Sequence, residues 1–167
     1  MSLIGQSVTV LGGGIGGLAA ARALALRGAQ VRVLEQAPQI TEVGAGLQIS
    51  PNGVAVLRAL GLEQAVIASA PRGQAVQLRD YRGASVLRMA LPTGAARGYY
   101  LMHRADLIDI LADGAREAGV ELVLGAKVSE ISCDKAGPAH LRFADGRAET
   151  PELLIGADGI NSVVRHD

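Results

Sequence analysis

"SVTVLGGGIGGLAAARALALRGAQVRVLE", residues 7–35, decides the fold of this chain. The stretch opens with β-branched and apolar residues at 7–11, which predict a buried strand, and continues into a glycine-rich turn. Residues 18–28 are rich in alanine and leucine and predict a helix closed by Gly28, and residues 30–35 predict a second strand. A strand, a helix and a second strand in this order predict a right-handed parallel crossover, so we expect an α/β fold.

The glycine-rich turn has the spacing G-x-G-x-x-G, with Gly12, Gly14 and Gly17 at the three fixed positions. Gly12 permits a tight turn, Gly14 lets the backbone approach a pyrophosphate at the helix amino end, and Gly17 allows close packing of helix on strand. Glu35 ends the second strand, where a carboxylate can bind both ribose hydroxyls of an adenosine. The pattern predicts a dinucleotide site without separating FAD from NAD. The alternative is a plain αβ domain with a solvated Glu35.

Composition narrows the classes of function. The 167 residues suffice for one domain with a core, and 16 basic residues balance 16 acidic ones. With only 2% aromatic residues, the chain lacks the base-stacking side chains of a nucleic-acid binder. The single cysteine, Cys133, reads as a half-buried strand residue and suits a reducing cytoplasm. No apolar run is long enough to span a membrane, and the three histidines lack metal-ligand spacing, so we expect neither membrane nor metal.

The rest of the chain continues the α/β pattern. Helices are predicted at 51–60 and 103–119, and a β-hairpin at 74–91 that turns near Arg82 and Gly83. Further strands are predicted at 120–124, 127–133, 139–143 and 152–156, followed by a helix opened near Ile160. The high mean hydropathy, +0.28, indicates a buried parallel sheet, a surface that lacks its covering partner, or both.

Three further motifs occur in order: "EVGAGLQISPNG" at 42–53, "HRADL" at 103–107 and "GADGINSVVR" at 156–165. Together with the glycine fingerprint they resemble the class A, single-component FAD-dependent aromatic hydroxylases. The similarity is to the branch of salicylate hydroxylase and 6-hydroxynicotinate 3-monooxygenase. It implies a three-layer, Rossmann-like FAD-binding domain of the glutathione-reductase type. Residues 1–73 and 99–167 would form its two segments, and 74–98 the hairpin of a substrate domain.

The resemblance also assigns cofactor contacts. It places Gly46 in a loop beside the flavin, Arg104 at the FAD pyrophosphate, and the backbone of Val128 at the adenine. Ile15 belongs to the fingerprint, and Asp158, followed by Gly159, is associated with both FAD and NAD(P)H. Each contact has a plainer reading. Val128 reads equally as a core residue and Asp158 as a turn former. Arg104 reads as a surface arginine in the first turn of a helix. A cation there is disfavoured by the helix dipole, and a bound phosphate nearby would explain its position.

The implied activity is FAD-dependent hydroxylation of a small aromatic acid with NAD(P)H and O2. We expect a cytoplasmic enzyme, and the sequence leaves open whether it forms a homo-oligomer. No residue identifies the catalytic groups or the substrate. The alternatives are an NAD-dependent dehydrogenase and a non-catalytic nucleotide-binding module. Because the family's later motifs do not appear, we expect this chain to be the first part of a longer protein and inactive by itself.

Overall fold

The computed structural model describes residues 3–40, 45–92, 98–133 and 137–166. The chain divides into two compact units: Met1–Glu42 with Ile108–Asp167, and Val43–Leu107. The first unit holds the glycine fingerprint, and the second holds the predicted hairpin. The assignment of 74–98 to a separate substrate domain stays a prediction.

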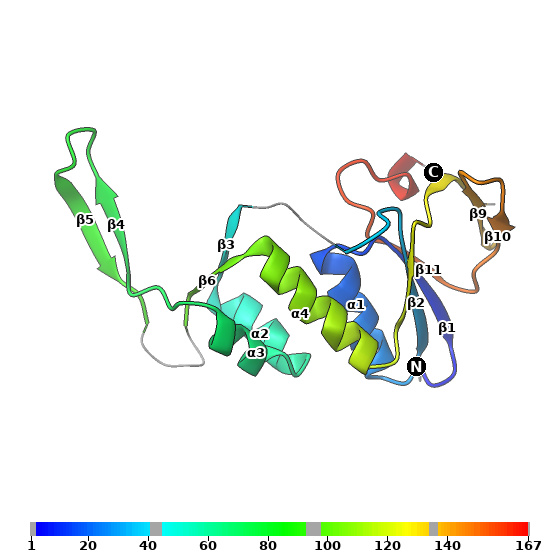
Figure 1. Cartoon of the computed structure of the whole chain (residues 1–167), viewed down its shortest axis with the longest axis horizontal. Helices are drawn as coiled ribbons and strands as arrows, with labels where there is room; N and C mark the ends of the chain where they lie inside the picture. The colour runs from blue at the N-terminus through cyan, green and yellow to red at the C-terminus, as the bar shows by residue number, and fades with distance from the viewer. Residues whose placement is uncertain (1–2, 41–44, 93–97, 134–136, 167) are drawn as a thin grey trace. The chain divides into compact units, whose positions relative to one another are not determined.

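A four-stranded parallel sheet forms the centre of the first unit (Figure 1). Its strands are β1 (Ser7–Leu11), β2 (Gln30–Glu35), β7 (Glu121–Leu124) and β11 (Leu154–Gly156), in the order β11-β1-β2-β7. The helix α1 (Ile15–Ala25) connects β1 to β2, so the predicted parallel crossover is confirmed. The helix begins three residues before the predicted start, because Gly14 serves as its N-cap.

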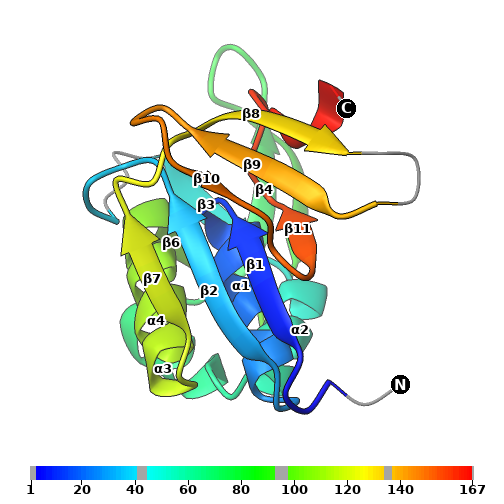
Figure 2. The ribbon, with the colours of Figure 1, turned by 90° about the vertical axis from the view of Figure 1, so that its right-hand side faces the viewer.

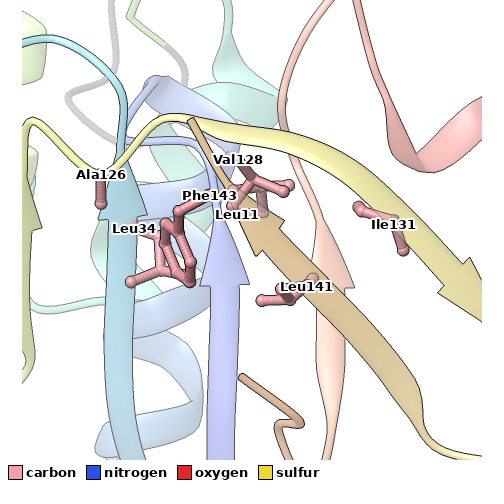
Figure 3. Close-up of a cluster of buried hydrophobic side chains, with 7 residues drawn as sticks. All are labelled: Leu11, Leu34, Ala126, Val128, Ile131, Leu141 and Phe143. Atoms are coloured by element: carbon pink, nitrogen blue, oxygen red, sulfur yellow. The ribbon is translucent and has the colours of Figure 1, made fainter. Parts of the chain in front are cut away.

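An antiparallel sheet covers the face of the parallel sheet opposite α1 (Figure 2). It consists of β8 (Val128–Cys133), β9 (Ala139–Phe143) and β10 (Ala148–Glu149), in the order β10-β9-β8. Between the two sheets lies a cluster of buried apolar side chains, drawn in Figure 3: Leu11, Leu34, Ala126, Val128, Ile131, Leu141 and Phe143. Burial of this cluster excludes water from between the layers and holds the antiparallel sheet near the ends of β1 and β2. The predicted α/β class is confirmed.

The second unit contains two separate antiparallel ribbons. The first pairs β3 (Gly46–Ile49) with β6 (Tyr100–His103), and α2 (Pro51–Ala59) and α3 (Glu63–Ser69) follow β3 along the chain. The second is the predicted hairpin, β4 (Ala75–Arg79) and β5 (Ser85–Ala90), whose turn contains Gly83 at φ +86. Its apolar side chains are exposed: Val76, Leu78, Val86, Leu87 and Met89.

The helix α4 (Arg104–Glu117) follows β6 directly and belongs to the second unit up to Leu107. Its later part lies in the first unit, where the Arg22 guanidinium of α1 donates a hydrogen bond to the Gly114 carbonyl oxygen. Leu111 and Ala115 are buried, and Ile110 is half-buried. Among the described helices, none combines the length and apolar character that crossing a membrane requires.

Two local predictions were wrong. Cys133 is exposed rather than half-buried, because it is the last residue of β8, at the edge of its sheet. The helix expected from Ile160 is absent from the described residues: a turn occupies 160–161, and only a short 3-10 helix, η2 (Val164–His166), follows. The reason is local, since the Asp158 side chain caps the backbone at 163–164 and delays the first helical turn.

Candidate functional site

The glycine loop leaves the carboxyl end of β1, and two of its glycines are required by packing within the protein. Gly12 has φ +109, and a Cβ built there would overlap the Ala157 carbonyl group. A Cβ at Gly17 would likewise overlap the Gly12 carbonyl oxygen. Side chains at either position would therefore push apart β1, α1 and the loop after β11. These two glycines are required by the fold and are not direct evidence for a ligand.

Gly14 differs from the other two: beyond its own neighbours in the chain and helix, no atom of the described residues lies within 4 Å of a Cβ built there. Its backbone, at φ −77 and ψ −177, is one that any residue adopts. Gly14 is the N-cap of α1 and has no side chain to bond the free amides of the first turn, which begins at Ile15. The open space therefore lies where helix amides and the helix dipole favour an anion. The arrangement fits a pyrophosphate.

Glu35 ends β2 beside this loop, and two backbone amides hold its carboxylate. The Gly13 N–H donates to Oε2 at 2.6 Å, and the Ala37 N–H donates to Oε1 at 2.8 Å. Each carboxylate oxygen can accept a second hydrogen bond, so the group remains able to bind ribose hydroxyls. An open cleft lies in front of it, lined by Gly13, Gly14, Glu35, Ala37, Gln39 and Ile108.

Asp158 is the second residue of the loop after β11, at the same edge of the sheet. Its Oδ1 accepts a hydrogen bond from the Ser162 hydroxyl at 2.7 Å, and its Oδ2 accepts from the amides of Val163 at 2.7 Å and Val164 at 3.3 Å. Partial burial raises the pKa of Asp158, but these hydrogen bonds favour the charged form more strongly, so the net pKa lies below its ordinary value. Asp158 forms the turn that the plainer reading expected. Its contact with a cofactor stays a prediction.

Val128 also lies in the first unit, as the first residue of β8. The residue is 8% exposed and its side chain packs in the cluster of Figure 3, so Val128 is a core residue. A contact between its backbone and adenine stays a prediction.

The second unit brings together Gly46 and Arg104. Gly46 opens β3 and pairs with His103, the residue before Arg104. The Arg104 N–H donates to the Ala45 carbonyl oxygen at 3.4 Å, which joins the loop before β3 to the start of α4. Within the part of the chain that the structure describes, no atom beyond the chain neighbours of Gly46 lies within 4 Å of a Cβ built there. A contact between Gly46 and the flavin stays a prediction. Residues 43–44 of the predicted flavin loop lie outside the described residues.

The structure adds groups that sequence reasoning missed. The amides of Gly13 and Ala37 hold Glu35, and the Ser162 hydroxyl holds Asp158. Ser162 could have been found, since a serine four residues after an aspartate in a turn can bond it. The two amides carry no sequence signal. Within the described parts of the chain, no group of three or more His, Cys, Asp or Glu is placed to hold a metal ion.

Comparison with known proteins gives consistent matches. The family model described as "FAD binding domain" matches residues 6–167. The chain is 41% identical over 165 residues to 3-hydroxybenzoate 6-hydroxylase of Polaromonas naphthalenivorans, covering 95% of the chain and 41% of that protein. It is 31% identical over 166 residues to 6-hydroxynicotinate 3-monooxygenase of Pseudomonas fluorescens, covering 96% and 42%.

Solved structures agree. The tetrameric form of 2-methyl-3-hydroxypyridine-5-carboxylic acid oxygenase superposes with a TM-score of 0.84 at 30% identity, covering 97% of this chain and 42% of that one. The chain thus spans well under half the length of the relatives that it matches.

Proposed function

Because the chain belongs to the FAD binding domain family, we propose that it is the FAD-binding part of a flavoprotein monooxygenase that hydroxylates an aromatic acid with NAD(P)H and O2. The resemblance to class A aromatic hydroxylases and the FAD cofactor, both predicted from the motifs, are confirmed. The aromatic acid is inferred from what the relatives' names say of those proteins. The share of their length that this chain spans makes the complete reaction a proposal.

The open space at Gly14 is the observation that supports cofactor binding most directly. A pyrophosphate there would accept hydrogen bonds from the first-turn amides, from Ile15 onward, which the N-cap glycine leaves without a side-chain partner. Glu35, already oriented by two amides, would bind the ribose hydroxyls of the adenosine half. Its negative charge would also repel a 2′-phosphate, which favours FAD over a phosphorylated nucleotide.

Two further assigned residues, Gly46 and Arg104, would contact the flavin ring and the pyrophosphate. We assign Gly46 to the edge of the flavin, because its open backbone permits close approach, and Arg104 to the pyrophosphate as a cation. Bound FAD supplies the hydride-accepting and oxygen-activating chemistry. The protein residues hold the cofactor, orient it and restrict water around it. The hairpin of β4 and β5, with its exposed apolar side chains, would belong to the part that encloses the aromatic acid.

Two experiments test this function. The purified 167-residue chain should bind FAD and turn yellow, but should show no NADH oxidation stimulated by aromatic acids. Substrate-stimulated turnover by this chain alone would show that the site is complete without further polypeptide. The hydroxylation itself is tested on a protein that joins this chain to the remainder of the family fold. That protein is incubated with a panel of hydroxybenzoates and hydroxypyridine carboxylates, NADH and isotopically labelled O2. One labelled oxygen atom from O2 is expected in the hydroxylated product, and hydroxylated product without that label would contradict a monooxygenase.

Neither alternative is favoured by a specific observation in the structure. A dehydrogenase that binds NAD, or an empty nucleotide-binding module, would remain colourless in the first experiment. A cytoplasmic location stays a prediction, and the sequence left open both a homo-oligomer and the choice between NADH and NADPH.

A further inference from the structure

The cleft in front of Glu35 is formed by three segments of the first unit. Its lining comes from the glycine loop, from the end of β2 with the segment after it, and from α4. The lining residues outside the glycine loop are Glu35, Ala37, Gln39, Ile40 and Ile108. Because the cleft adjoins the glycine loop, a nucleotide bound by that loop would also meet these residues.

The path of the segment after β2 is fixed by hydrogen bonds at Ala37. The Ala37 N–H donates to the Glu35 Oε1 at 2.8 Å, and the Ala37 carbonyl oxygen accepts from the Gly125 N–H at 2.9 Å. Both polar groups of the Ala37 backbone are therefore bonded within the first unit. Gln39 follows two residues later and is exposed, so its amide group is available at the rim of the cleft.

Gln39 supplies the hydrogen-bonding group that Glu35 lacks. The Glu35 carboxylate only accepts hydrogen bonds, and Ala37, Ile40 and Ile108 have apolar side chains. Of the described residues that line the cleft, Gln39 is the only one whose side chain carries an N–H donor. The cleft therefore combines one accepting side chain with one donating side chain.

A ribose matches this combination. Each of its 2′- and 3′-hydroxyls is both a donor and an acceptor. When Glu35 accepts the hydroxyl protons, the hydroxyl oxygens still need donors, and the NH2 group of Gln39 can donate to one of them. Ile108 is 3% exposed and Ile40 is half-buried, so the cleft has an apolar wall that limits water around these contacts.

We propose that Gln39 is a ribose-binding residue of the cofactor site: its amide donates to a ribose hydroxyl oxygen, and together with Glu35 it selects a nucleotide whose two ribose hydroxyls are both free. The proposal rests on the FAD-binding function above. It extends the site beyond the glycine fingerprint and its terminal acid, because Gln39 lies four residues past Glu35.

ADP and 2′,3′-dideoxy-ADP test the contact, because both carry the adenine and the pyrophosphate and only ADP carries the ribose hydroxyls. Each nucleotide is titrated against the chain with FAD bound, and flavin fluorescence reports the displacement of FAD. Gln39→Ala should weaken ADP binding by about three- to tenfold and leave the affinity for 2′,3′-dideoxy-ADP unchanged. Parent-like ADP affinity, or an equal loss with both nucleotides, would overturn the proposal.

A second variant and a control complete the test. Gln39→Glu keeps the length of the side chain but replaces its donor with a second carboxylate near Glu35, so ADP affinity should fall further than in Gln39→Ala. A smaller fall would overturn the proposal. Gln30→Ala is the matched control, because Gln30 is an exposed glutamine at the opposite end of β2. It should bind both nucleotides as the parent does, and a loss equal to that of Gln39→Ala would overturn the proposal.

The same titrations separate this proposal from the proposed function. A parent chain that fails to bind FAD would refute the proposed function. A parent chain that binds FAD but does not release it to ADP would show that the cleft does not hold the adenosine half, and would overturn the role of Gln39 alone. Because Gln39 is exposed, both variants should unfold at the temperature of the parent.

Discussion

Gly14→Val should abolish FAD binding while leaving the fold intact. The added side chain enters open space, since among the described residues no atom beyond the neighbouring ones lies within 4 Å of a Cβ at this position. The backbone angles at Gly14 suit any residue. Losing glycine at a helix N-cap costs about 0.5–1 kcal/mol of stability. Replacing glycine where the backbone is compatible returns about 0.4–1 kcal/mol through the unfolded chain. The net change in stability is therefore close to zero.

The effect on the cofactor is much larger. A valine at Gly14 fills the space from which a pyrophosphate would reach the first-turn amides of α1. Hydrogen bonds to a charged group contribute about 1.5–3 kcal/mol each. Loss of two such contacts would weaken FAD binding by roughly 3–6 kcal/mol, or on the order of a hundredfold to ten-thousandfold.

Calorimetric titration with FAD, paired with thermal unfolding, measures both quantities. Gly16→Ala is the control, because Gly16 is exposed and occupies a variable position of the fingerprint. A Cβ built there meets no atom of the described residues within 4 Å beyond its own neighbours in the chain and helix. This variant should bind FAD as the parent does. Gly12→Ala should instead unfold, because strain and overlap together cost on the order of 2–6 kcal/mol. Parent-like FAD affinity in a folded Gly14→Val would refute the reasoning.

Three further outcomes follow from the site. Glu35→Ala should weaken FAD binding by about 1.5–3 kcal/mol, because the ribose contact is lost. It should also lower the free energy of unfolding, because the Gly13 and Ala37 amides lose their acceptor. Unchanged FAD affinity by calorimetry would contradict the role of Glu35 in binding ribose. Val128→Ala should lower the free energy of unfolding by about 1–3 kcal/mol without changing FAD affinity, since only its backbone is assigned to the adenine, and chemical denaturation checks this. The pKa of Asp158 is depressed in the folded chain, so its carboxylate stabilises the fold above its ordinary pKa of about 4, and this stabilisation is lost as pH falls below that value. Asp158→Asn should flatten that part of the acid-unfolding curve. An unchanged curve would contradict a stabilising role for the hydrogen bonds that the Asp158 carboxylate accepts.

Local patterns predicted the central elements of the first unit well, because a short contiguous stretch of residues determines them. The stretch 7–35 contains a strand, a turn, a helix and a strand, each with its own composition and periodicity, and the structure has all of them. The position of Glu35 at the end of β2 followed from the same stretch. Its partners did not, because backbone amides such as those of Gly13 and Ala37 exist in every residue and depend on the three-dimensional path.

The elements that were missed depend on distant partners or lack boundary signals. The pairing of β3 with β6 joins residues 46–49 to 100–103, which no periodicity within either segment can reveal. The helix α3 has seven residues and begins after Leu62, with no capping side chain to mark its start. The helix expected near Ile160 failed for the opposite reason, since Asp158 and Ser162 form a specific local network that overrides helical composition.

Titration of the purified chain with FAD and with FMN tests the central claim most directly. FMN carries the flavin ring and one phosphate but lacks the adenosine half that the glycine loop and Glu35 are assigned to bind. Flavin fluorescence should show saturable binding of FAD, with FMN failing to displace it at comparable concentration. Equal binding of FMN, or no saturable binding of FAD, would contradict the assignment of this chain as the domain that binds FAD through its adenosine diphosphate half.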